Sequence, residues 1–276
     1  MRVEQAERER GRHPLGRIYR VREARGQEVK SVKGKLVVKK LMAQINYSTR
    51  VGWFTEHPKI FQGYLDAPDR FSRWAHGPGH FEVIAPKEYR HLVAGPKQAN
   101  ASLENIETNL IRDELNDFAG FFGSVLSHLK PDKIDRLGVR AFFLVPTSSF
   151  SDLVSALRKD FVGPLVNTTA FSNARESDFM LIWELENGDT QPARGRAKWQ
   201  LGPVRREEFG KWFESTSQQA DEERKWFPST AFMGDIDWMT TEVEASPDAL
   251  AKGLLANWES AYSAFEDIAT AVARDC

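Results

Sequence analysis

Residues 230–272 read TAFMGDIDWMTTEVEASPDALAKGLLANWESAYSAFEDIATAV, a strand pattern followed directly by a helix pattern. In the first part, Asp235 and Asp237 alternate with apolar residues, which is typical of a half-buried strand over 230–243. Ser246 then offers a helix N-cap, with Pro247 at the first helical position. Beyond it, apolar residues recur at spacings of four and three, which predicts a long amphipathic helix. These residues are Leu254, Trp258, Ala261, Phe265, Ile268 and Val272.

A second long helix is predicted over residues 103–129, where apolar residues repeat at the same spacings and Pro131 ends the pattern. Gly120 and Gly123 lie inside this helix. Glycine weakens a helix by about 1 kcal/mol relative to alanine, so we expect close packing against a neighbour at both positions. Both helix patterns are too short for a coiled coil and lack its flanking charge pairs. We therefore expect the two helices to pack on a sheet of the same chain.

The strands of that sheet are predicted from alternating apolar and polar residues. Residues 179–186 and 193–201 are expected to form a hairpin around Asn187-Gly188-Asp189. Short helices are expected over 151–160 and 205–217. The other expected strands span 36–47, 81–84, 89–93 and 134–145. Together these elements predict an α+β fold, with a mainly antiparallel sheet backed by two long amphipathic helices.

Composition and cysteine usage indicate the kind of protein. The chain has 276 residues, 41% of them hydrophobic, which is enough for one sizeable core. Its single cysteine, Cys276, excludes a disulfide within the chain and fits a reducing cytoplasm. No apolar run approaches the roughly 20 residues that span a bilayer, and the charged N-terminus does not resemble a secretory signal. We therefore expect a cytoplasmic protein without a membrane segment.

The net charge of −1 hides a strong asymmetry along the chain. Residues 1–41 hold 13 Lys and Arg against 5 Glu, a net charge of +8, whereas the remaining residues carry −9. We expect residues 1–34 to be a basic flexible arm and residues 35–276 a single α+β domain. Such an arm could bind nucleic acid through residues 1–41. Alternatively, it is solvated, it rests on the acidic body, or translation starts at Met42.

Charged residues of several strands are predicted to share one face of the sheet, because side chains two residues apart on a strand point to the same side. Gly138 lies between two of them and would allow a ligand or another backbone to approach closely. The residues are Arg136 and Arg140 in 134–145, Arg194 and Arg196 in 193–201, and Asp235 and Asp237 in 230–243.

This charged face has two interpretations. It could be the solvated side of an antiparallel sheet, with cross-strand ion pairs such as Glu186 with Arg194 contributing about 0.2–1 kcal/mol each. Alternatively, Arg136, Arg140, Asp235 and Asp237 converge on a ligand or a partner.

No motif identifies a catalytic site, since phosphate-binding loops, HExxH, GxSxG and paired CxxC are absent. Asp235 and Asp237 could hold Mg²⁺ in a hydrolase, but no further ligand can be assigned. Two histidines that flank a turn likewise lack a further metal ligand, and one Ser-x-x-Lys spacing lacks the companion motifs of a catalytic site. The sequence therefore predicts no catalytic residue, no metal site and no cofactor. The two weaker patterns are His76 with His80, and Ser127 with Lys130.

Residues 132–140, DKIDRLGVR, and 234–238, GDIDW, resemble short motifs of a sporadically distributed family of uncharacterised bacterial proteins. That family has a strand of the Arg-(Ile/Leu)-Gly-x-Arg type after a long helix, an Asp-Ile-Asp strand, and a closing amphipathic helix. The resemblance covers roughly residues 42–273, although residues 141–143 replace the usual Tyr-x-Asn and the basic arm is extra. Its patchy occurrence implies an accessory role, such as a partner in a defence or mobile-element system.

These observations favour a non-catalytic protein-binding component of a bacterial intracellular system, with the charged face as the binding surface. One alternative is a nucleic-acid-associated protein that uses its basic arm. The other is a metal-dependent hydrolase that uses Asp235 and Asp237.

Overall fold

The computed structural model describes residues 36–77, 79–159, 181–186, 195–208 and 227–273. All of the described elements belong to one compact unit, residues 32–276. The basic arm expected over residues 1–34 lies outside the described residues. None of the described helices is long and apolar enough to cross a membrane.

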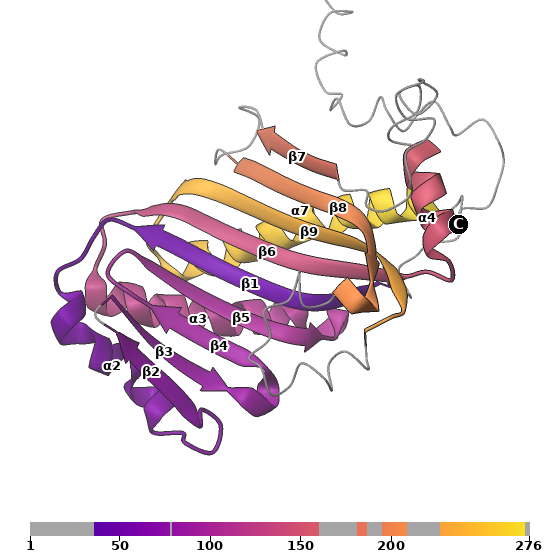
Figure 1. The fold of residues 1–276 in the computed structure, drawn as a ribbon. Coiled ribbons are helices and arrows are strands. Elements are labelled where there is room, and N and C mark those ends of the chain that lie inside the picture. Colours follow the sequence, from indigo (N-terminus) through magenta and orange to yellow (C-terminus); the bar gives the residue numbers. More distant parts are fainter. Residues whose placement is uncertain (1–35, 78, 160–180, 187–194, 209–226, 274–276) are drawn as a thin grey trace, which may run out of the picture. The chain divides into compact units, whose positions relative to one another are not determined.

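The described strands form one nine-stranded sheet, and every neighbouring pair is antiparallel (Figure 1). The sheet is mainly built from neighbours in sequence, except that β1 is inserted between β5 and β6, and β9 between β6 and β8. From edge to edge the order is β2 (Arg73–Gly77), β3 (His80–Ala85), β4 (Arg90–Ala94), β5 (Gln98–Ile106), β1 (Val37–Tyr47), β6 (Ile134–Pro146), β9 (Thr230–Val243), β8 (Gly195–Arg205) and β7 (Leu181–Glu186).

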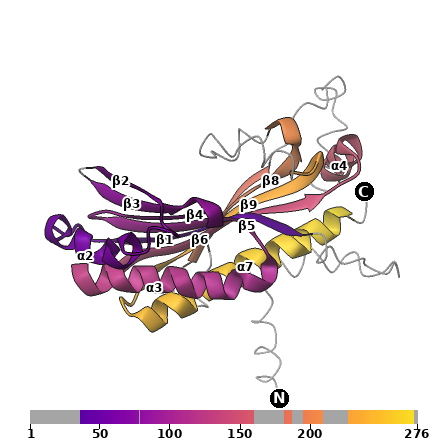
Figure 2. The same cartoon turned by 90° about the horizontal axis from the view of Figure 1, so that it is seen from below.

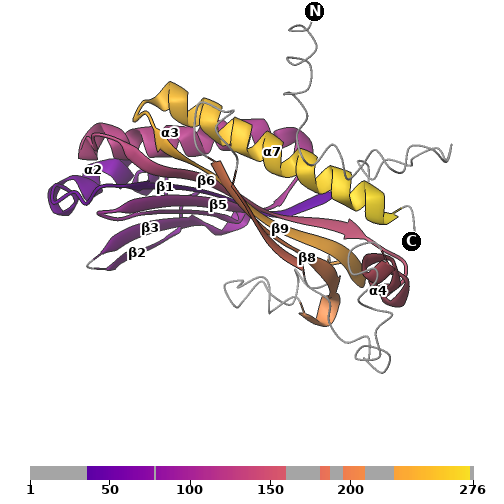
Figure 3. The same ribbon diagram turned by 90° about the horizontal axis from the view of Figure 1, so that it is seen from above.

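Two long helices, α3 (Ile111–Leu129) and α7 (Pro247–Ala273), pack against each other and cover one face of the sheet (Figures 2 and 3). Helix α2 (Trp53–Leu65) packs on α3 and β3, and α4 (Phe150–Leu157) packs on β8 and β9. Short 3₁₀ helices span Pro86–Glu88, Thr108–Leu110 and Arg206–Glu208. The predicted fold class, an antiparallel sheet backed by two long amphipathic helices, is confirmed.

The main core lies between this helical layer and the sheet. Phe265 of α7 stacks on Phe143 of β6 and Phe232 of β9, with ring centroids 4.9 and 5.5 Å apart. The buried amide of Asn257 donates a hydrogen bond to the Leu137 carbonyl at 3.0 Å, which ties α7 to β6. The predicted cap of α7 is also present, because the Ala249 N–H donates to Ser246 Oγ at 3.3 Å.

The long helix predicted over 103–129 begins too early, because its first residues belong to a strand. Helix α3 starts only at Ile111, and residues 98–106 form β5. Ala99, Ala101 and Leu103 are buried there, and β5 is hydrogen-bonded to both β4 and β1. Leu103 lies eight residues before Ile111, in phase with the helix pattern, which explains the error. Pairing on both sides satisfies the backbone of this segment in the extended conformation.

Three further elements differ from the sequence-based expectation. Helix α2 and strand β2 lie in the region 51–80, for which no element was predicted. The helix predicted over 205–217 is wrong in its described part, since Arg205 still belongs to β8 and a 3₁₀ turn follows. Residues 209–217 lie outside the described residues, as do the hairpin turn at 187–189 and residue 160, the last of the helix predicted over 151–160.

Candidate binding face of the sheet

The charged residues of β6 and β9 lie on the face of the sheet opposite α3 and α7. Leu137, Val139 and Ala141 of β6 are buried in the main core, so the alternate residues of β6 point away from it. Two of these are the predicted site residues Arg136 and Arg140. We define the charged face by the residues of the three adjacent strands that share this side: Arg136, Gly138 and Arg140 of β6, Asp235 and Asp237 of β9, and Arg196 and Lys198 of β8.

Arg140 and Asp235 form a two-point ion pair across β6 and β9. Nε and one Nη of Arg140 donate to the two carboxylate oxygens at 2.7 and 2.6 Å. The side chain of Asp235 is only 6% exposed, whereas that of Arg140 is 45% exposed and lies over the ring of Phe142 at 5.0 Å. The hydrogen bonds from Arg140 to Asp235 raise the pKa of the guanidinium above its ordinary value. The carboxylate therefore holds an exposed arginine in one orientation.

A second ion pair runs across the same two strands. Arg136 donates to Asp237 at 2.7 Å, and the two side chains are 27% and 29% exposed. Arg136 is directly opposite Thr241 in the register, so its side chain reaches diagonally over Gly138. A Cβ on Gly138 would meet the Arg136 guanidinium at 3.4 Å. The space above Gly138, which would have allowed a ligand or another backbone to approach, is therefore occupied by Arg136.

The basic residues of β8 extend this surface on the far side of β9. Lys198 is directly opposite Asp237, and Arg196 is opposite Met239, with both side chains exposed. Arg194, the remaining predicted site residue, lies outside the described residues. The expected pairing of Glu186 with Arg194 does not match the register, which places Glu186 opposite Arg196.

Amide side chains border the charged face on the β1 side, and this neighbourhood was not predicted from the sequence. In the register, Asn46 is opposite Arg136 and Met42 is opposite Arg140. Gln44 donates to Asn46 at 2.9 Å and lies 3.4 Å from the amide oxygen of Gln98 on β5. The polar alternation of residues 42–46 was visible in the sequence, but the contact between β1 and β6 was not.

One end of this side of the sheet is apolar rather than charged. Phe142 and Leu144 of β6, Met233 of β9 and Phe227 form a second buried cluster there. Arg206 donates to the Phe227 carbonyl at 2.7 Å, which fixes the segment that carries Phe227. The charged face therefore lies beside a buried apolar cluster on the same side of the sheet.

The arrangement does not favour metal chemistry at Asp235 and Asp237. Both oxygens of Asp235 accept hydrogen bonds from Arg140, and Asp237 accepts one from Arg136. No cluster of three or more His, Cys, Asp or Glu side chains suited to a metal ion occurs within the described part of the chain. A cation at this position would have to displace an arginine.

The structure also shows the contacts made by residues of the two weaker sequence patterns. His76 of β2 stacks on His57 of α2, with ring centroids 5.1 Å apart. Ser127 donates to the carbonyl of Ser124 in its own helix, at 2.8 Å. Lys130 is the C-cap of α3 in the left-handed conformation. These contacts are explained by local packing.

Comparisons with known proteins do not assign a family to the chain. No protein-family model and no curated protein matches it. Among solved structures, it is similar to the Pseudomonas aeruginosa T6SS protein PA0821, with 13% sequence identity over 81% of this chain and 73% of that one. The TM-score of 0.22 is too low for this likeness to say anything about fold or function.

Proposed function

We propose that this chain is a non-catalytic protein-binding component that docks a protein partner through the charged face. The pair between Arg140 and Asp235 is the observation that carries the proposal. Arginine is common among residues that dominate protein interfaces, and immobilising a long side chain costs affinity. Because Asp235 already holds Arg140, much of that entropic cost is met before a partner binds.

The mixture of charges favours a protein over a nucleic acid at this surface. Asp235 and Asp237 lie within 2.7 Å of the arginines they bind, so these two pairs have no net charge, and the excess of two positive charges on the face comes only from Arg196 and Lys198 of β8. A phosphate backbone binds best to cations that are not already paired with carboxylates. The resemblance to the sporadic bacterial family suggests an intracellular defence or mobile-element system as the setting, with action in the cytoplasm.

The test uses a charge swap that keeps an ion pair on the sheet. Reversing the charge of Arg140 would leave the buried Asp235 carboxylate without its partner and would endanger the fold. The pair of Arg136 and Asp237 is better suited, because both residues are partly exposed. Arg136→Asp combined with Asp237→Arg keeps one ion pair and reverses the charges that a partner would meet. Because the new arginine lies opposite Arg140 and Lys198 in the register, circular dichroism must first show that this variant is folded.

A matched control is available on the helical layer. Lys252 and Asp248 of α7 form an exposed ion pair at 2.6 Å, so Lys252→Asp with Asp248→Lys is an equivalent swap away from the sheet. Affinity capture from the native host should recover one stoichiometric protein with the wild type and the control, and lose it with the sheet swap. Equal recovery by all three proteins would contradict the proposal.

A further inference from the structure

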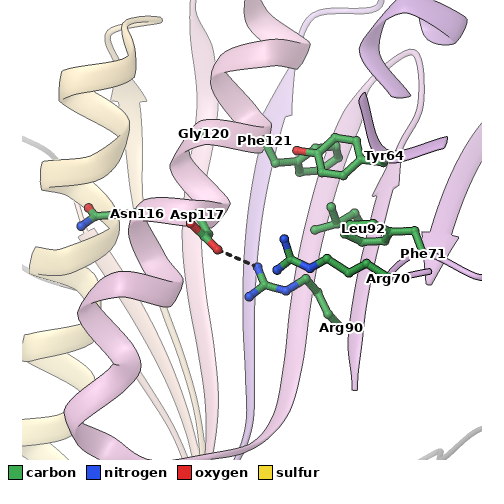
Figure 4. Close-up of a pocket in the computed structure, with 9 residues that line it drawn as sticks. All are labelled: Tyr64, Arg70, Phe71, Arg90, Leu92, Asn116, Asp117, Gly120 and Phe121. Carbon is green, nitrogen blue, oxygen red and sulfur yellow. Dashed lines mark ion pairs between the residues drawn. The ribbon is translucent and has the colours of Figure 1, made fainter. Parts of the chain in front are cut away.

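A pocket of about 250 Å³ lies on the helical side of the sheet, where α2, α3 and β4 meet (Figure 4). Its apolar wall includes Tyr64, Leu92 and Phe121. Tyr64 meets Phe71 and Phe121 nearly edge-on, with ring centroids 5.1 and 5.9 Å apart. Drug-sized ligands occupy cavities of about 300–1,000 Å³, so this pocket suits a smaller molecule with a single ring.

Gly120 of α3 keeps the pocket open. A Cβ built on this residue would have no atom within 4 Å, and Gly120 is one of the residues that line the pocket. The close packing that we expected at Gly120 from the sequence is therefore wrong. The Cβ of Gly123 would meet only the side chain of Pro247, at 3.8 Å or more. The absence of a side chain at Gly120 therefore leaves an open space beside α3, rather than allowing a neighbour to pack closely.

Hydrogen-bond donors are concentrated on one side of this space. Figure 4 shows the guanidinium groups of Arg70 and Arg90 extending toward α3. The side chain of Arg90 is only 7% exposed, and its Nε makes no hydrogen bond among the described residues, although Glu88 lies 3.5 Å from it as an ion-pair partner. Burial raises the pKa of the Tyr64 hydroxyl, which stays protonated as a further donor. A buried guanidinium with an incomplete set of hydrogen bonds is unfavourable, so Arg90 would gain from a closer acceptor.

The carboxylates around the two arginines are not equally engaged. Glu88 accepts two hydrogen bonds from Arg70 Nε, at 2.7 and 3.0 Å, and Glu114 is in close contact with Arg90. Asp117, in contrast, is 59% exposed and lies 3.4 Å from Arg90. Two arginines therefore face three carboxylates, and Asp117, the most exposed of the three, is the one that a ligand carboxylate could replace at Arg90.

We propose that this pocket binds a small aromatic carboxylate, with its ring against Tyr64, Leu92 and Phe121 and its carboxylate at Arg90 in place of Asp117. Arginine recognises carboxylates through charge-assisted hydrogen bonds, and the aromatic wall suits a flat ring. The site lies on the opposite side of the sheet from the charged face, so it does not depend on the function proposed above.

The experiment titrates benzoate into the full chain and follows ligand-observed NMR, with benzyl alcohol as the uncharged comparison. For a molecule of this size we expect a dissociation constant in the millimolar range. Gly120→Leu should weaken benzoate binding at least tenfold by filling the pocket. Asp117→Asn should strengthen it severalfold by removing the competing carboxylate. Gly63→Leu is the matched control, since Gly63 is another helix glycine with open space around it and lies outside the pocket.

The proposal requires benzoate to bind the wild type and the Gly63→Leu protein equally, and more tightly than benzyl alcohol does. Absence of benzoate binding in the wild type would overturn it. So would binding that is unchanged by Gly120→Leu, or that Asp117→Asn fails to strengthen. Circular dichroism of each variant distinguishes a filled pocket from a loss of fold.

Discussion

Arg140 binds both carboxylate oxygens of Asp235, yet the two partners differ sharply in exposure: the aspartate side chain is 6% exposed and the arginine side chain 45%. The cost of losing each partner must therefore differ. A partly exposed arginine can be hydrated when its partner is removed, whereas a buried carboxylate cannot.

Arg140→Met should destabilise the protein by about 2 kcal/mol, because it leaves Asp235 buried without its cationic partner. Adding Asp235→Leu to this variant should restore at least half of the loss, since Asp235 is opposite Phe142 in the register and an apolar side chain is compatible with that neighbour. Urea denaturation of the two variants and the wild type provides the measurement. A double variant no more stable than Arg140→Met would show that the buried charge is not the cause.

Gly138 should tolerate alanine but not valine. An added Cβ would lie 3.4 Å from the Arg136 guanidinium, which is ordinary van der Waals contact, whereas the branched side chain of valine would displace Arg136 from Asp237. We expect Gly138→Ala to change the free energy of unfolding by less than about 1 kcal/mol, within the range of alanine-for-glycine effects. Gly138→Val should lose the coupling between Arg136 and Asp237 in a double-mutant cycle. An intact coupling energy in the valine variant would contradict the diagonal path of Arg136.

Gly120→Ala should stabilise the protein by about 0.5–1 kcal/mol. Alanine is the better helix former, and no atom lies within 4 Å of the added Cβ. Gly234 offers the opposite case, because a Cβ there would collide with the buried ring of Phe265. Gly234→Ala should therefore destabilise by about 1–3 kcal/mol through overpacking. Thermal unfolding of both variants tests the contrast, and a shift of the same sign in both would refute it.

Tyr47 should make stability fall at alkaline pH. Burial raises the pKa of its hydroxyl above the ordinary value of 10.0, and the hydroxyl donates to the Gly95 carbonyl at 2.7 Å. Above pH 10, the unfolded chain releases the tyrosine proton while the folded chain retains it, so rising pH favours unfolding. Below pH 10 this contribution is fully present.

The variant Tyr47→Phe isolates this effect. It should be about 1 kcal/mol less stable than the wild type at pH 7, because it lacks the hydrogen bond to Gly95. The difference should shrink between pH 10 and pH 11, because only the wild type loses the contribution of Tyr47. Urea denaturation at pH 7, 10 and 11 gives the comparison, and a constant difference across this range would contradict the assignment.

Local patterns accounted for much of the fold. The cap at Ser246 and the apolar spacing from Leu254 onward lie within one helix, so short-range geometry was sufficient to predict α7. The same spacing misled at Leu103, where the deciding factor was pairing with β4 and β1. Such pairing joins residues far apart in the sequence and leaves no local signal.

The candidate site shows the same limit. Alternation along each strand was enough to place Arg136 and Arg140 on one face, and Asp235 and Asp237 on one face. It could not show which arginine binds which aspartate, because Arg140 is directly opposite Asp237 but pairs diagonally with Asp235. The pocket beside Gly120 was missed because a glycine that permits close packing and one that leaves a space look alike in a sequence.

The most direct test of the charged face is the affinity of the captured partner for three purified proteins, measured by calorimetry at one salt concentration. These are the wild type, the Arg136→Asp/Asp237→Arg swap on the sheet, and the Asp248→Lys/Lys252→Asp swap on α7. The account predicts equal dissociation constants for the wild type and the α7 swap, and a value at least tenfold weaker for the sheet swap. A sheet swap that binds as tightly as the wild type would contradict it.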